Sequence, residues 1–454
     1  MNQPSDAVGN DDGDGSAPDH VVTAFLRNGG EVLLLRRSDA VGTYVGQWGG
    51  VSGFAEDQPD EQVRVEIREE TGLADRCSFV RSGRPVRVED DALEREWVVH
   101  PYLFECGSRD PELSEEHDAF AWVQPTAMLD SDADRETVQK LWTAYERVAP
   151  TVRSIAADDE HGAAFLSVRA LEVLRDRAGV LVAEREEFGA DPDGEWDELA
   201  ELAGRLLEAR PSMAVLRNRV NRTVADAGAR AGEDGAETPD APAVLEAAIS
   251  GIDRALGADA DAAGNASERL EGTVATLSWS GTVLEALRRG TPSRVFVAES
   301  RPAREGIDVA ETLREDAAVD CPVTVHTDAA AAHVLAREAV DRVVVGADTV
   351  LPGGSVVNKT GTRGLALAAA REGVPVSVVA ATDKISTREE INLESGDRSA
   401  VYDGPVDVDV TNPIFDVTPA DCVDEIVTER GALEPAAVEA VVAELRELEG
   451  WRTE

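Results

Sequence analysis

The sequence predicts an amino-terminal α+β domain, with a mixed sheet between helices, followed by a helical domain and an α/β domain with a Rossmann-like parallel sheet. Three observations predict this order. Alternating apolar segments surround one helical segment before residue 150, helical periodicity fills residues 151–256, and short apolar strands alternate with helices from Gly272 onward. The last pattern is typical of βαβ units. We place the domains at residues 20–150, 151–265 and 266–454, after a disordered acidic leader at residues 1–18.

The elements of the amino-terminal domain follow from local patterns. Residues 21–38 alternate as two strands joined by an Asn-Gly-Gly turn, which predicts a hairpin. A glycine-rich loop and one helix occupy residues 42–72, with apolar positions four residues apart. Strands are predicted around residues 79–88 and 97–105, and a last helix at residues 137–148.

The two later domains are predicted from longer patterns. Helical periodicity runs through residues 161–181, 196–227 and 241–256. The strands that alternate with helices after them are TVATL, SRVFVAES, PVTVHTD, RVVVGAD and PVSVVAAT. Ligands of open parallel sheets bind beyond the carboxyl ends of the strands, so the residues that follow these strands are the candidate site.

The charge balance excludes some partners. The chain of 454 residues has 89 Asp and Glu against 44 Lys and Arg, a formal charge of −45. Such a surface repels phosphate backbones and anionic lipid, so we expect no nucleic-acid or membrane partner. Lysine occurs at positions 140, 359 and 384 alone, and the other basic residues are arginine. This acidic, lysine-poor composition is the one expected at very high salt, which predicts a cytoplasmic protein of a halophile.

The first 18 residues and the cysteines agree with that location. The leader lacks the basic and apolar segments of a signal peptide, and the chain has no run of 18 apolar residues. We therefore expect a protein that is neither exported nor membrane-spanning. The cysteines lie far apart in sequence without metal-ligand spacing, which predicts buried, reduced thiols. They are Cys77, Cys106, Cys321 and Cys422.

Residues 48–73 carry the first candidate site. Within the predicted helix, Glu66, Glu69 and Glu70 stand at i, i+3 and i+4 and therefore share one face. Three carboxylates within one turn repel one another, and a hard divalent cation such as Mg²⁺ relieves the repulsion. Such an ion can bridge a pyrophosphate and lower the pKa of an attacking water. A very acidic chain also produces glutamate runs by chance, but the flanking Gly-Gly loop and the closing ETGL make chance a poor explanation.

This segment resembles the Nudix hydrolase box, Gx5Ex7REUxEExGU, in which U is aliphatic. The matching residues are Gly50, Glu56, Glu66, Ile67, Glu69, Glu70, Gly72 and Leu73. There are two departures: the spacing after Glu56 is one residue longer, and Val65 takes the place of the family's arginine, with Arg64 beside it. The arginine orients the glutamates in the family, so its loss puts rate and geometry in doubt more than metal binding. The resemblance covers residues 20–150, including Trp122 before the last helix.

The resemblance implies Mg²⁺- or Mn²⁺-dependent hydrolysis of a nucleoside diphosphate linked to another group. Glu66, Glu69 and Glu70 would hold the metal, and one of them or a loop acid would serve as base. Arg36 or Arg37 would contact phosphate, although a strand-end arginine is more often a surface charge. The sequence does not fix the leaving group.

The second candidate site follows the strands of the parallel sheet. Hydroxyls and small residues at helix starts can donate hydrogen bonds to phosphate, and basic side chains add charge. The candidate phosphate or ligand contacts are Ser278, Ser280, Thr282, Arg301, Asn358, Lys359 and Lys384. Asp348, in the GAD segment, is the acid expected inside the pocket. Each segment alone predicts little more than a turn, but their succession in one βαβ series indicates a phosphate-ligand site.

These segments resemble the family that joins the regulatory subunits of translation initiation factor 2B, ribose-1,5-bisphosphate isomerase and methylthioribose-1-phosphate isomerase. The resemblance extends from HGAAFLSVRAL and EARPSMAVLRNRV to NPIFDVTPADCVDEIVTERG. The isomerases use a cysteine and an aspartate, and Asp348 matches the aspartate, whereas Ser278 stands at the cysteine position. A hydroxyl has a far higher pKa than a thiol, so Ser278 needs new help to act as the same acid or base.

Three functions remain open at this point. The first is a Nudix hydrolase fused to a domain that binds a nucleotide or ribose phosphate. The second is a bifunctional enzyme whose second part isomerises an aldose to a ketose, and the third is a translation-factor-like interaction protein. The resemblance implies a homo-oligomer formed through the carboxy-terminal domain. Lys359 and Lys384 stand at neighbouring strand ends in a chain that has almost eliminated lysine, which favours an anion site there.

Overall fold

The computed structural model describes residues 18–55, 58–130, 135–233 and 238–452. The predicted leader lies outside the described residues except for Pro18, and so do Glu56 of the Nudix pattern and its neighbour Asp57. Contacts divide the chain into two compact units, one ending at Ala149 and the other beginning at Pro150. Each unit is described by itself below.

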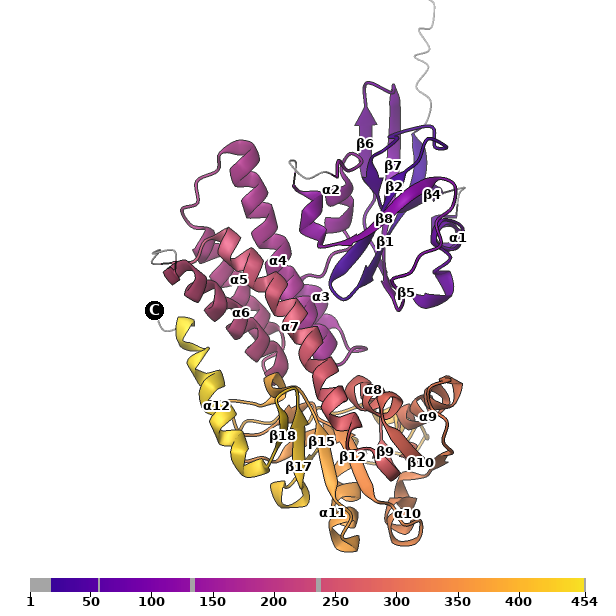
Figure 1. The fold of residues 1–454 in the computed structure, drawn as a ribbon, viewed down its shortest axis with the longest axis vertical. Helices are drawn as coiled ribbons and strands as arrows, with labels where there is room; N and C mark the ends of the chain where they lie inside the picture. Colours follow the sequence, from indigo (N-terminus) through magenta and orange to yellow (C-terminus); the bar gives the residue numbers. More distant parts are fainter. Residues whose placement is uncertain (1–17, 56–57, 131–134, 234–237, 453–454) are drawn as a thin grey trace, which may run out of the picture. The chain divides into compact units, whose positions relative to one another are not determined.

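The first unit is built on a mixed sheet of eight strands among the described residues (Figure 1). Its strands are β1 (Asp19–Asn28), β2 (Glu31–Arg37), β3 (Trp48–Gly49), β4 (Val51–Phe54), β5 (Cys77–Ser82), β6 (Val86–Asp90), β7 (Arg95–Cys106) and β8 (His117–Val123). β1 pairs with β7 in parallel and with β2 and β4 antiparallel, so the mixed sheet is confirmed. The helices α1 (Pro59–Thr71) and α2 (Leu141–Glu146) accompany it.

Two predicted elements of this unit have different bounds. The strand expected at residues 79–88 is divided into β5 and β6 at Gly83, where a Cβ atom would lie 2.6 Å from the Cβ atom of Arg147. Alternation alone does not reveal such a close approach. The last helix begins at Leu141 rather than at residue 137.

Helix α1 begins and ends as its sequence predicts. Pro59 is its first residue, where a missing N–H costs nothing, and Gly72 ends it in the left-handed conformation at φ 66°. Val63 and Ile67 are buried against the sheet, being 1% and 0% exposed. This burial fixes which face of α1 turns toward β1 and β4, and therefore where its glutamates lie.

The second unit starts with helices, and Figure 1 shows the four long ones gathered as a bundle. The helices are α3 (Val152–Ala157), α4 (Ala163–Phe188), α5 (Glu195–Ala209), α6 (Ala214–Glu233) and α7 (Ala241–Ser267). The predicted helical segments are therefore confirmed. The segment at residues 196–227 forms two helices, because Pro211 cannot continue a helix and the chain turns there.

A seven-stranded sheet follows in the order β11-β10-β9-β12-β15-β17-β18, parallel except for its last pair. Its strands are β9 (Glu271–Leu277), β10 (Thr291–Ala298), β11 (Val323–His326), β12 (Arg342–Gly346), β15 (Val376–Val379), β17 (Glu425–Thr428) and β18 (Gly431–Leu433). A smaller antiparallel sheet consists of β13 (Thr349–Val350), β14 (Val356–Lys359) and β16 (Phe415–Thr418). The parallel sheet is thus confirmed, and its description as Rossmann-like stays a prediction.

Both faces of the large sheet are covered, as its continuous apolar strands require. In β12, Val343 and Val345 face one core and Val344 faces the other. The surrounding helices are α8 (Gly281–Arg289), α9 (Glu305–Glu315), α10 (Ala331–Arg337), α11 (Thr362–Glu372) and α12 (Val438–Glu447). The parallel strands β9, β10, β12 and β15 share one carboxyl edge, which places the candidate ligand segments together.

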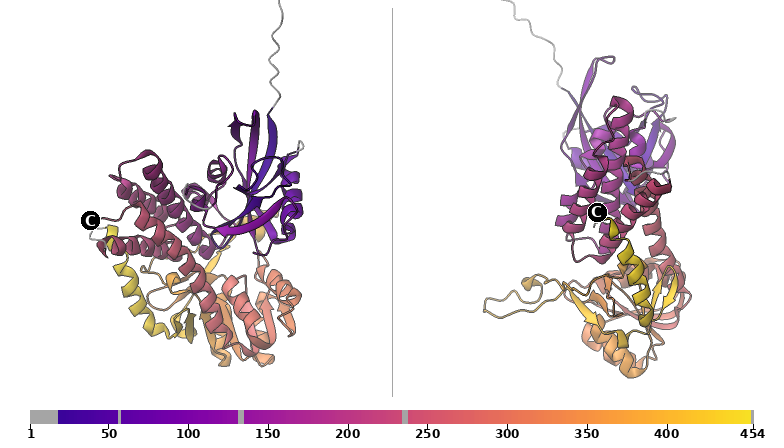
Figure 2. Two further views of the ribbon diagram at one scale, coloured as in Figure 1. Left: turned by 45° about the horizontal axis from the view of Figure 1, so that its top comes forward. Right: turned by 90° about the vertical axis from the view of Figure 1, so that its left-hand side faces the viewer.

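Between residue 385 and β16 the chain extends away from the rest of this unit (Figure 2, right). Five large apolar side chains on this segment, here called the arm, are exposed. They are Ile391, Leu393, Val401, Val406 and Val408. Elsewhere the four cysteines are buried and free, as predicted, although Cys77 and Cys106 lie opposite each other on β5 and β7. Across the described ranges, no helix is both long and apolar enough to cross a lipid bilayer.

Candidate functional site

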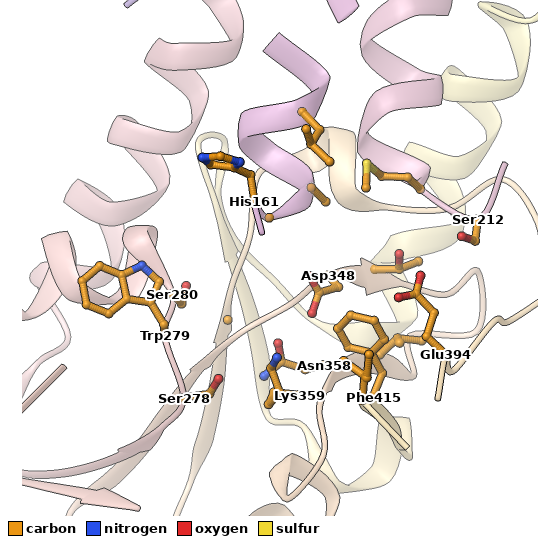
Figure 3. Close-up of a pocket in the computed structure, with 18 of the residues that line it drawn as sticks. His161, Ser212, Ser278, Trp279, Ser280, Asp348, Asn358, Lys359, Glu394 and Phe415 are labelled. Atoms are coloured by element: carbon orange, nitrogen blue, oxygen red, sulfur yellow. The ribbon is translucent and has the colours of Figure 1, made fainter. Parts of the chain in front are cut away.

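A cavity of about 380 Å³ opens at the carboxyl edge of the large sheet in the second unit (Figure 3). The predicted residues Ser278, Ser280, Asp348, Asn358 and Lys359 all line it. They come from the ends of β9, β12 and β14 and from the start of α8. The strand order places β9 beside β12, which is why residues 70 positions apart in sequence face one cavity.

Asp348 follows β12 directly, and its side chain points into the cavity in Figure 3. Burial raises the pKa of its carboxyl group, and the charges of Lys384 and Lys359 lower it by smaller amounts. The charge of Glu305 adds to the upward shift. A carboxyl group with this environment holds its proton more tightly than an exposed aspartate does.

Ser278 begins the turn after β9 in a left-handed conformation, with φ at 59°. Its amide donates a 2.6 Å hydrogen bond to the hydroxyl of Ser300, and its own hydroxyl donates to the carboxylate of Glu305. A serine held at positive φ is strained, and such strain is found where a site must be held in place. Ser280 caps α8 by accepting a hydrogen bond from the amide of Val283.

Lys359 ends β14, and its ammonium nitrogen lies 2.9 Å from a carboxylate oxygen of Glu305. It also lies 5.8 Å from the centre of the Phe415 ring. Its neighbour Asn358 is buried, and its amide donates to the hydroxyl of Thr362 at the start of α11. Both side chains are therefore held in position at the edge of the cavity.

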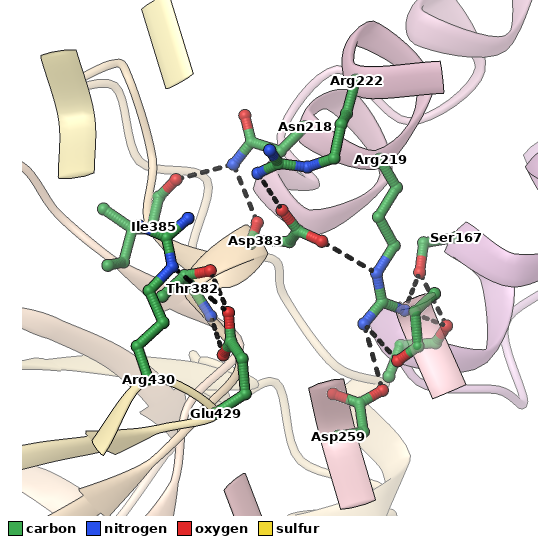
Figure 4. Close-up of polar contacts among 12 residues, drawn as sticks. Ser167, Asn218, Arg219, Arg222, Asp259, Thr382, Asp383, Ile385, Glu429 and Arg430 are labelled. Carbon is green, nitrogen blue, oxygen red and sulfur yellow. Dashed lines mark hydrogen bonds and ion pairs between the residues drawn. The ribbon is translucent and has the colours of Figure 1, made fainter. Parts of the chain in front are cut away.

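Lys384 lies behind this cavity and is not among its lining residues. It is 8% exposed and donates a 2.7 Å hydrogen bond to the carbonyl of Ala347. The preceding residue, Asp383, accepts a 2.8 Å hydrogen bond from Arg222 and lies 3.6 Å from Arg219, both on α6 (Figure 4). The side-chain amide of Asn218 donates to the carbonyls on either side of Lys384. The helical part of this unit thus holds the Lys384 turn in place.

Besides Lys384, two further predicted ligand contacts do not reach the cavity. Arg301 is exposed and pairs with Glu299 at 3.5 Å, because the turn after β10 directs it to solvent. Thr282 is the second residue of α8 and is not among the lining residues, since it follows Ser280 around the first helical turn. The prediction that these two side chains bind phosphate has no support in the geometry.

Most of the other lining residues were not predicted from the sequence, and four of them bring charged or aromatic side chains close to the predicted ones. His161 and Arg210 come from the helical part, Trp279 stands between the two predicted serines, and Glu305 begins α9. The His161 ring is held by Asp158 at 2.9 Å and stacks on Phe165. The one signal for Glu305 in the sequence is its place shortly after the predicted strand SRVFVAES, in the same segment as the predicted Arg301.

In the first unit, the three predicted glutamates of α1 are not grouped around one point. Glu70 is 3% exposed and accepts a hydrogen bond of 3.2 Å from the amide of Ser52, whereas Glu69 is exposed. The carboxyl group of Glu66 lies against Gly53, where a Cβ atom would be 2.1 Å from it. Over the described residues, no group of three or more His, Cys, Asp or Glu side chains is arranged to hold a metal ion. Spacing at i, i+3 and i+4 therefore predicted the shared face but not the different depths.

The environment of Glu70 is nevertheless unusual. Burial and then the charge of Glu66 raise the pKa of Glu70 to about 9, and the charge of Glu116 adds to this. Arg37 is the nearby cation, and burial lowers the pKa of its guanidinium. Glu66 and Glu70 are close enough for their charges to interact, and carboxylate oxygens are the ligands that a hard divalent cation prefers. Of the two predicted phosphate contacts, Arg37 lies at this site, and Arg36 pairs with Asp118 at 2.6 Å.

The arginine of the Nudix pattern has no replacement on α1. Val65 is half-buried, and the guanidinium of Arg64 lies 5.5 Å from the centre of the Phe104 ring. Next to Arg37, a cavity of about 160 Å³ is lined by Tyr44, Phe54 and Trp97 among others. The first unit therefore combines an acidic helix, a half-buried arginine and an aromatic-lined cavity.

The fold and the two sites define the class of protein: an α/β unit with a charged cavity at the carboxyl edge of its sheet, joined to a mixed-sheet unit with an acidic helix. The chain belongs to the initiation factor 2 subunit family, whose model matches residues 159–435. It also carries a NUDIX domain at residues 18–143. Both family assignments made from the sequence are confirmed.

Relatives of the second unit include two kinds of isomerase. The chain is 36% identical to ribose 1,5-bisphosphate isomerase of Haloterrigena turkmenica, over 67% of this chain and 94% of that protein. It is 34% identical to methylthioribose-1-phosphate isomerase of Pseudomonas putida, over 65% of this chain and 87% of that protein. The crystal structure of translation initiation factor eIF-2B from Pyrococcus horikoshii matches 64% of this chain and 98% of its own, with 27% identity and a TM-score of 0.51.

Proposed function

We propose that the second unit isomerises a ribose 1-phosphate to the corresponding ketose, and that the first unit hydrolyses a nucleoside diphosphate derivative. The observation that carries the first part is Asp348, a carboxyl group with a raised pKa inside the cavity, near the charges of Lys359 and Lys384. The two relatives named as isomerases are both named for ribose 1-phosphates. This supports a shared substrate class.

Isomerisation of a ribose 1-phosphate requires an acid at the ring oxygen of the sugar. A phosphate on C1 blocks the free aldehyde, so the sugar ring must open while the phosphate stays attached. A carboxyl group that keeps its proton near neutral pH can donate it to the departing ring oxygen. Burial raises the pKa of the Asp348 carboxyl group, which favours the protonated form that this step needs. Lys359 and the hydroxyls of Ser278 and Ser280 would contact the phosphate groups or sugar hydroxyls.

A binding function without turnover is the second candidate for this unit. It is favoured by one observation, the hydroxyl of Ser278 at the position where the family's isomerases use a thiol. A nucleotide or a ribose phosphate would then be a regulatory ligand. A translation-factor-like interaction role without either activity is the remaining alternative, for which the structure offers no specific feature.

The test incubates the full chain at high salt with ribose 1,5-bisphosphate or methylthioribose 1-phosphate and follows the sugar carbons by ¹³C NMR. We expect the C2 signal of a ketose to appear, and Asp348→Asn to abolish it. Calorimetry on the same samples measures binding. Binding by the wild type without any ketose signal would replace the isomerase proposal with the binding function, and absence of both would reject both.

For the first unit, we propose that Glu66 and Glu70 hold Mg²⁺ or Mn²⁺. The ion, when bound, would screen the pyrophosphate charge and lower the pKa of the attacking water. Glu116 is the loop acid whose charge reaches Glu70, so it is our candidate for the base. Arg37 would contact phosphate, and the cavity beside it would accept the nucleoside.

A panel of nucleoside diphosphate sugars, dinucleoside polyphosphates and nucleoside triphosphates tests this activity, with products identified by mass spectrometry. We expect metal-dependent hydrolysis that stops on addition of a chelator. Glu70→Gln should lose the activity, and Arg36→Gln should keep it because Arg36 pairs with Asp118 outside the site. Hydrolysis that persists in the chelator would reject the metal-dependent mechanism.

We also propose that the protein is cytoplasmic and halophilic and forms a homo-oligomer through its carboxy-terminal domain. The exposed apolar residues on the arm, among them Val401 and Val406, support self-association. Light scattering after size exclusion at high salt measures the mass. A double change of Val401 and Val406 to Asp should reduce it to that of one chain.

A further inference from the structure

Glu305 is the hydrogen-bond partner of the Ser278 hydroxyl in the cavity. One carboxylate oxygen of Glu305 accepts the hydrogen bond from the Ser278 hydroxyl. The other oxygen lies 2.9 Å from the ammonium nitrogen of Lys359. Both partners are at strand ends and are themselves held by the backbone, so the carboxylate has a fixed orientation within the cavity.

This arrangement leaves Glu305 able to accept a proton. A carboxylate has about four lone-pair positions, and two are used by Ser278 and Lys359. Glu305 is also near enough to Asp348 for its charge to raise the pKa of that group. Among the carboxyl groups that line the cavity, Asp348 and Glu305 thus have different surroundings: Asp348 is half-buried at the end of β12, and Glu305 is paired with a lysine.

We propose that Glu305 is the catalytic base of the second unit. It would take the role of the cysteine of the family's isomerases, because this chain has Ser278 at the cysteine position. The inference rests on the proposed isomerase function and assigns one of its two proton-transfer groups. Ser278 contributes by donating its hydroxyl proton to the Glu305 carboxylate and thereby orienting it. Its own ionisation is not needed, which removes the difficulty of the high pKa of a hydroxyl.

The proton transfers balance with these two groups alone. Asp348 gives its proton to the ring oxygen as the bond from that oxygen to C1 breaks. Glu305 takes the proton from C2, and the electron pair of the C2–H bond forms the C1–C2 double bond of an enol phosphate. The enol hydroxyl at C2 then gives its proton to Asp348 as the carbonyl forms, and C1 takes the proton from Glu305. Both carboxyl groups return to their starting states.

Two substitutions separate the carboxylate from the hydroxyl. Glu305→Gln keeps the shape of the side chain but removes the base, so kcat should fall at least 100-fold while the Kd for ribose 1,5-bisphosphate changes less than tenfold. Ser278→Ala keeps the base and should lower kcat less than tenfold. Glu311→Gln is the matched control, because Glu311 is exposed on the same helix, and kcat should stay within twofold.

A double variant provides a gain of function. Adding Ser278→Cys to Glu305→Gln should raise kcat at least tenfold above that of Glu305→Gln, with a rate that increases toward the range where thiols ionise, around pH 8.5. In D₂O, the wild type should incorporate deuterium into the sugar, and Glu305→Gln should not. This exchange readout reports proton removal even where later steps limit turnover.

The outcomes distinguish this inference from the proposed function. An active wild type with Glu305→Gln within threefold of it in kcat and in deuterium exchange would overturn the role of Glu305 alone. A wild type that binds the sugar phosphate without turnover or exchange would overturn the isomerase proposal and Glu305 with it. Loss of both binding and turnover in Glu305→Gln, with the circular dichroism melt unchanged, would make Glu305 a ligand contact instead of a base.

Discussion

The ammonium group of Lys384 donates a hydrogen bond of 2.7 Å to the backbone carbonyl of Ala347, the residue that immediately precedes Asp348. Lys384 is buried, so this contact ties the turn after β15 to the turn after β12. Its charge is also the strongest of those that lower the pKa of Asp348 against the effect of burial. A single lysine therefore fixes the backbone at Asp348 and limits how tightly Asp348 holds its proton.

Replacing Lys384 by Met should raise the pKa of Asp348 further, because burial remains and the strongest opposing charge is removed. If Asp348 is the acid of the reaction, it stays protonated to higher pH but donates less readily. We expect kcat to fall at least tenfold and the alkaline limb of the pH profile to move upward by about one unit. The measurement is kcat/KM for ribose 1,5-bisphosphate against pH. Lys140→Met, in the first unit, should leave the limb in place, and a downward shift in Lys384→Met would contradict the assignment.

Much of the second site could be predicted because parallel strands deliver their following residues to one edge. Ser278, Asp348 and Lys359 were found in this way, from strand ends alone. Glu305 at the start of α9 and Arg210 at the end of α5 could not be found, because periodicity does not say which helix ends turn toward a cavity. A contact between positions 278 and 305 depends on the order of β9 and β10 in the sheet, which the sequence leaves open.

In the first site, the helix could be predicted from the sequence, but the depths of its glutamate side chains could not. The helix and its bounds could be predicted from Pro59, Gly72 and the buried stripe, and the structure confirms them. The depths of Glu69 and Glu70 differ because only Glu70 turns against the amide of Ser52 on β4. Strand β4 reads VSGF, in which apolar and polar residues do not alternate, so alternation does not predict it.

Gly53 tests the importance of this packing. A methyl group added there would lie 2.1 Å from the Glu66 carboxyl group, so Gly53→Ala must displace that side chain, which is flexible and does not require the backbone to move. We expect metal-dependent hydrolysis to fall at least tenfold while the melting temperature changes little. Gly42→Ala is the matched control, since nothing lies within 4 Å of its added Cβ atom. Equal activity in the two variants would show that Glu66 has no role in hydrolysis.

Glu70 makes the stability of the first unit depend on pH. Its pKa is about 9 in the folded chain against an ordinary value of 4.5, so unfolding releases a proton between these values and stability falls as pH rises through them. Glu70→Gln removes this loss. In a chelator, we expect the variant to be more stable than the wild type by about 1–3 kcal/mol at pH 8, and equally stable near pH 4. Urea unfolding at several pH values measures this, with the exposed Glu69→Gln as the control.

Added Mg²⁺ should act in the opposite sense on the same residue. A divalent ion that binds the Glu70 carboxylate stabilises the folded state, so the wild type should gain stability with Mg²⁺ at pH 8. Glu70→Gln should gain much less. An equal gain in both chains would place the ion elsewhere and contradict the proposed metal contact.

Asp383 is expected to couple the helical part of the second unit to its ligand site. It is 5% exposed and is paired with Arg222 and Arg219, the latter only 2% exposed (Figure 4). Asp383→Asn leaves the buried Arg219 and the half-buried Arg222 without their shared charge, while Asp259 still pairs with Arg219, and this should cost about 1–3 kcal/mol in the free energy of unfolding. Asp226→Asn breaks the more exposed pair with Arg254 and should cost less than about 1 kcal/mol. Urea unfolding of the full chain at high salt gives both values. Because Lys384 follows Asp383 directly, the first variant should also weaken ribose 1,5-bisphosphate binding under conditions where it remains folded, and unchanged binding would show that the Lys384 turn is held without Asp383.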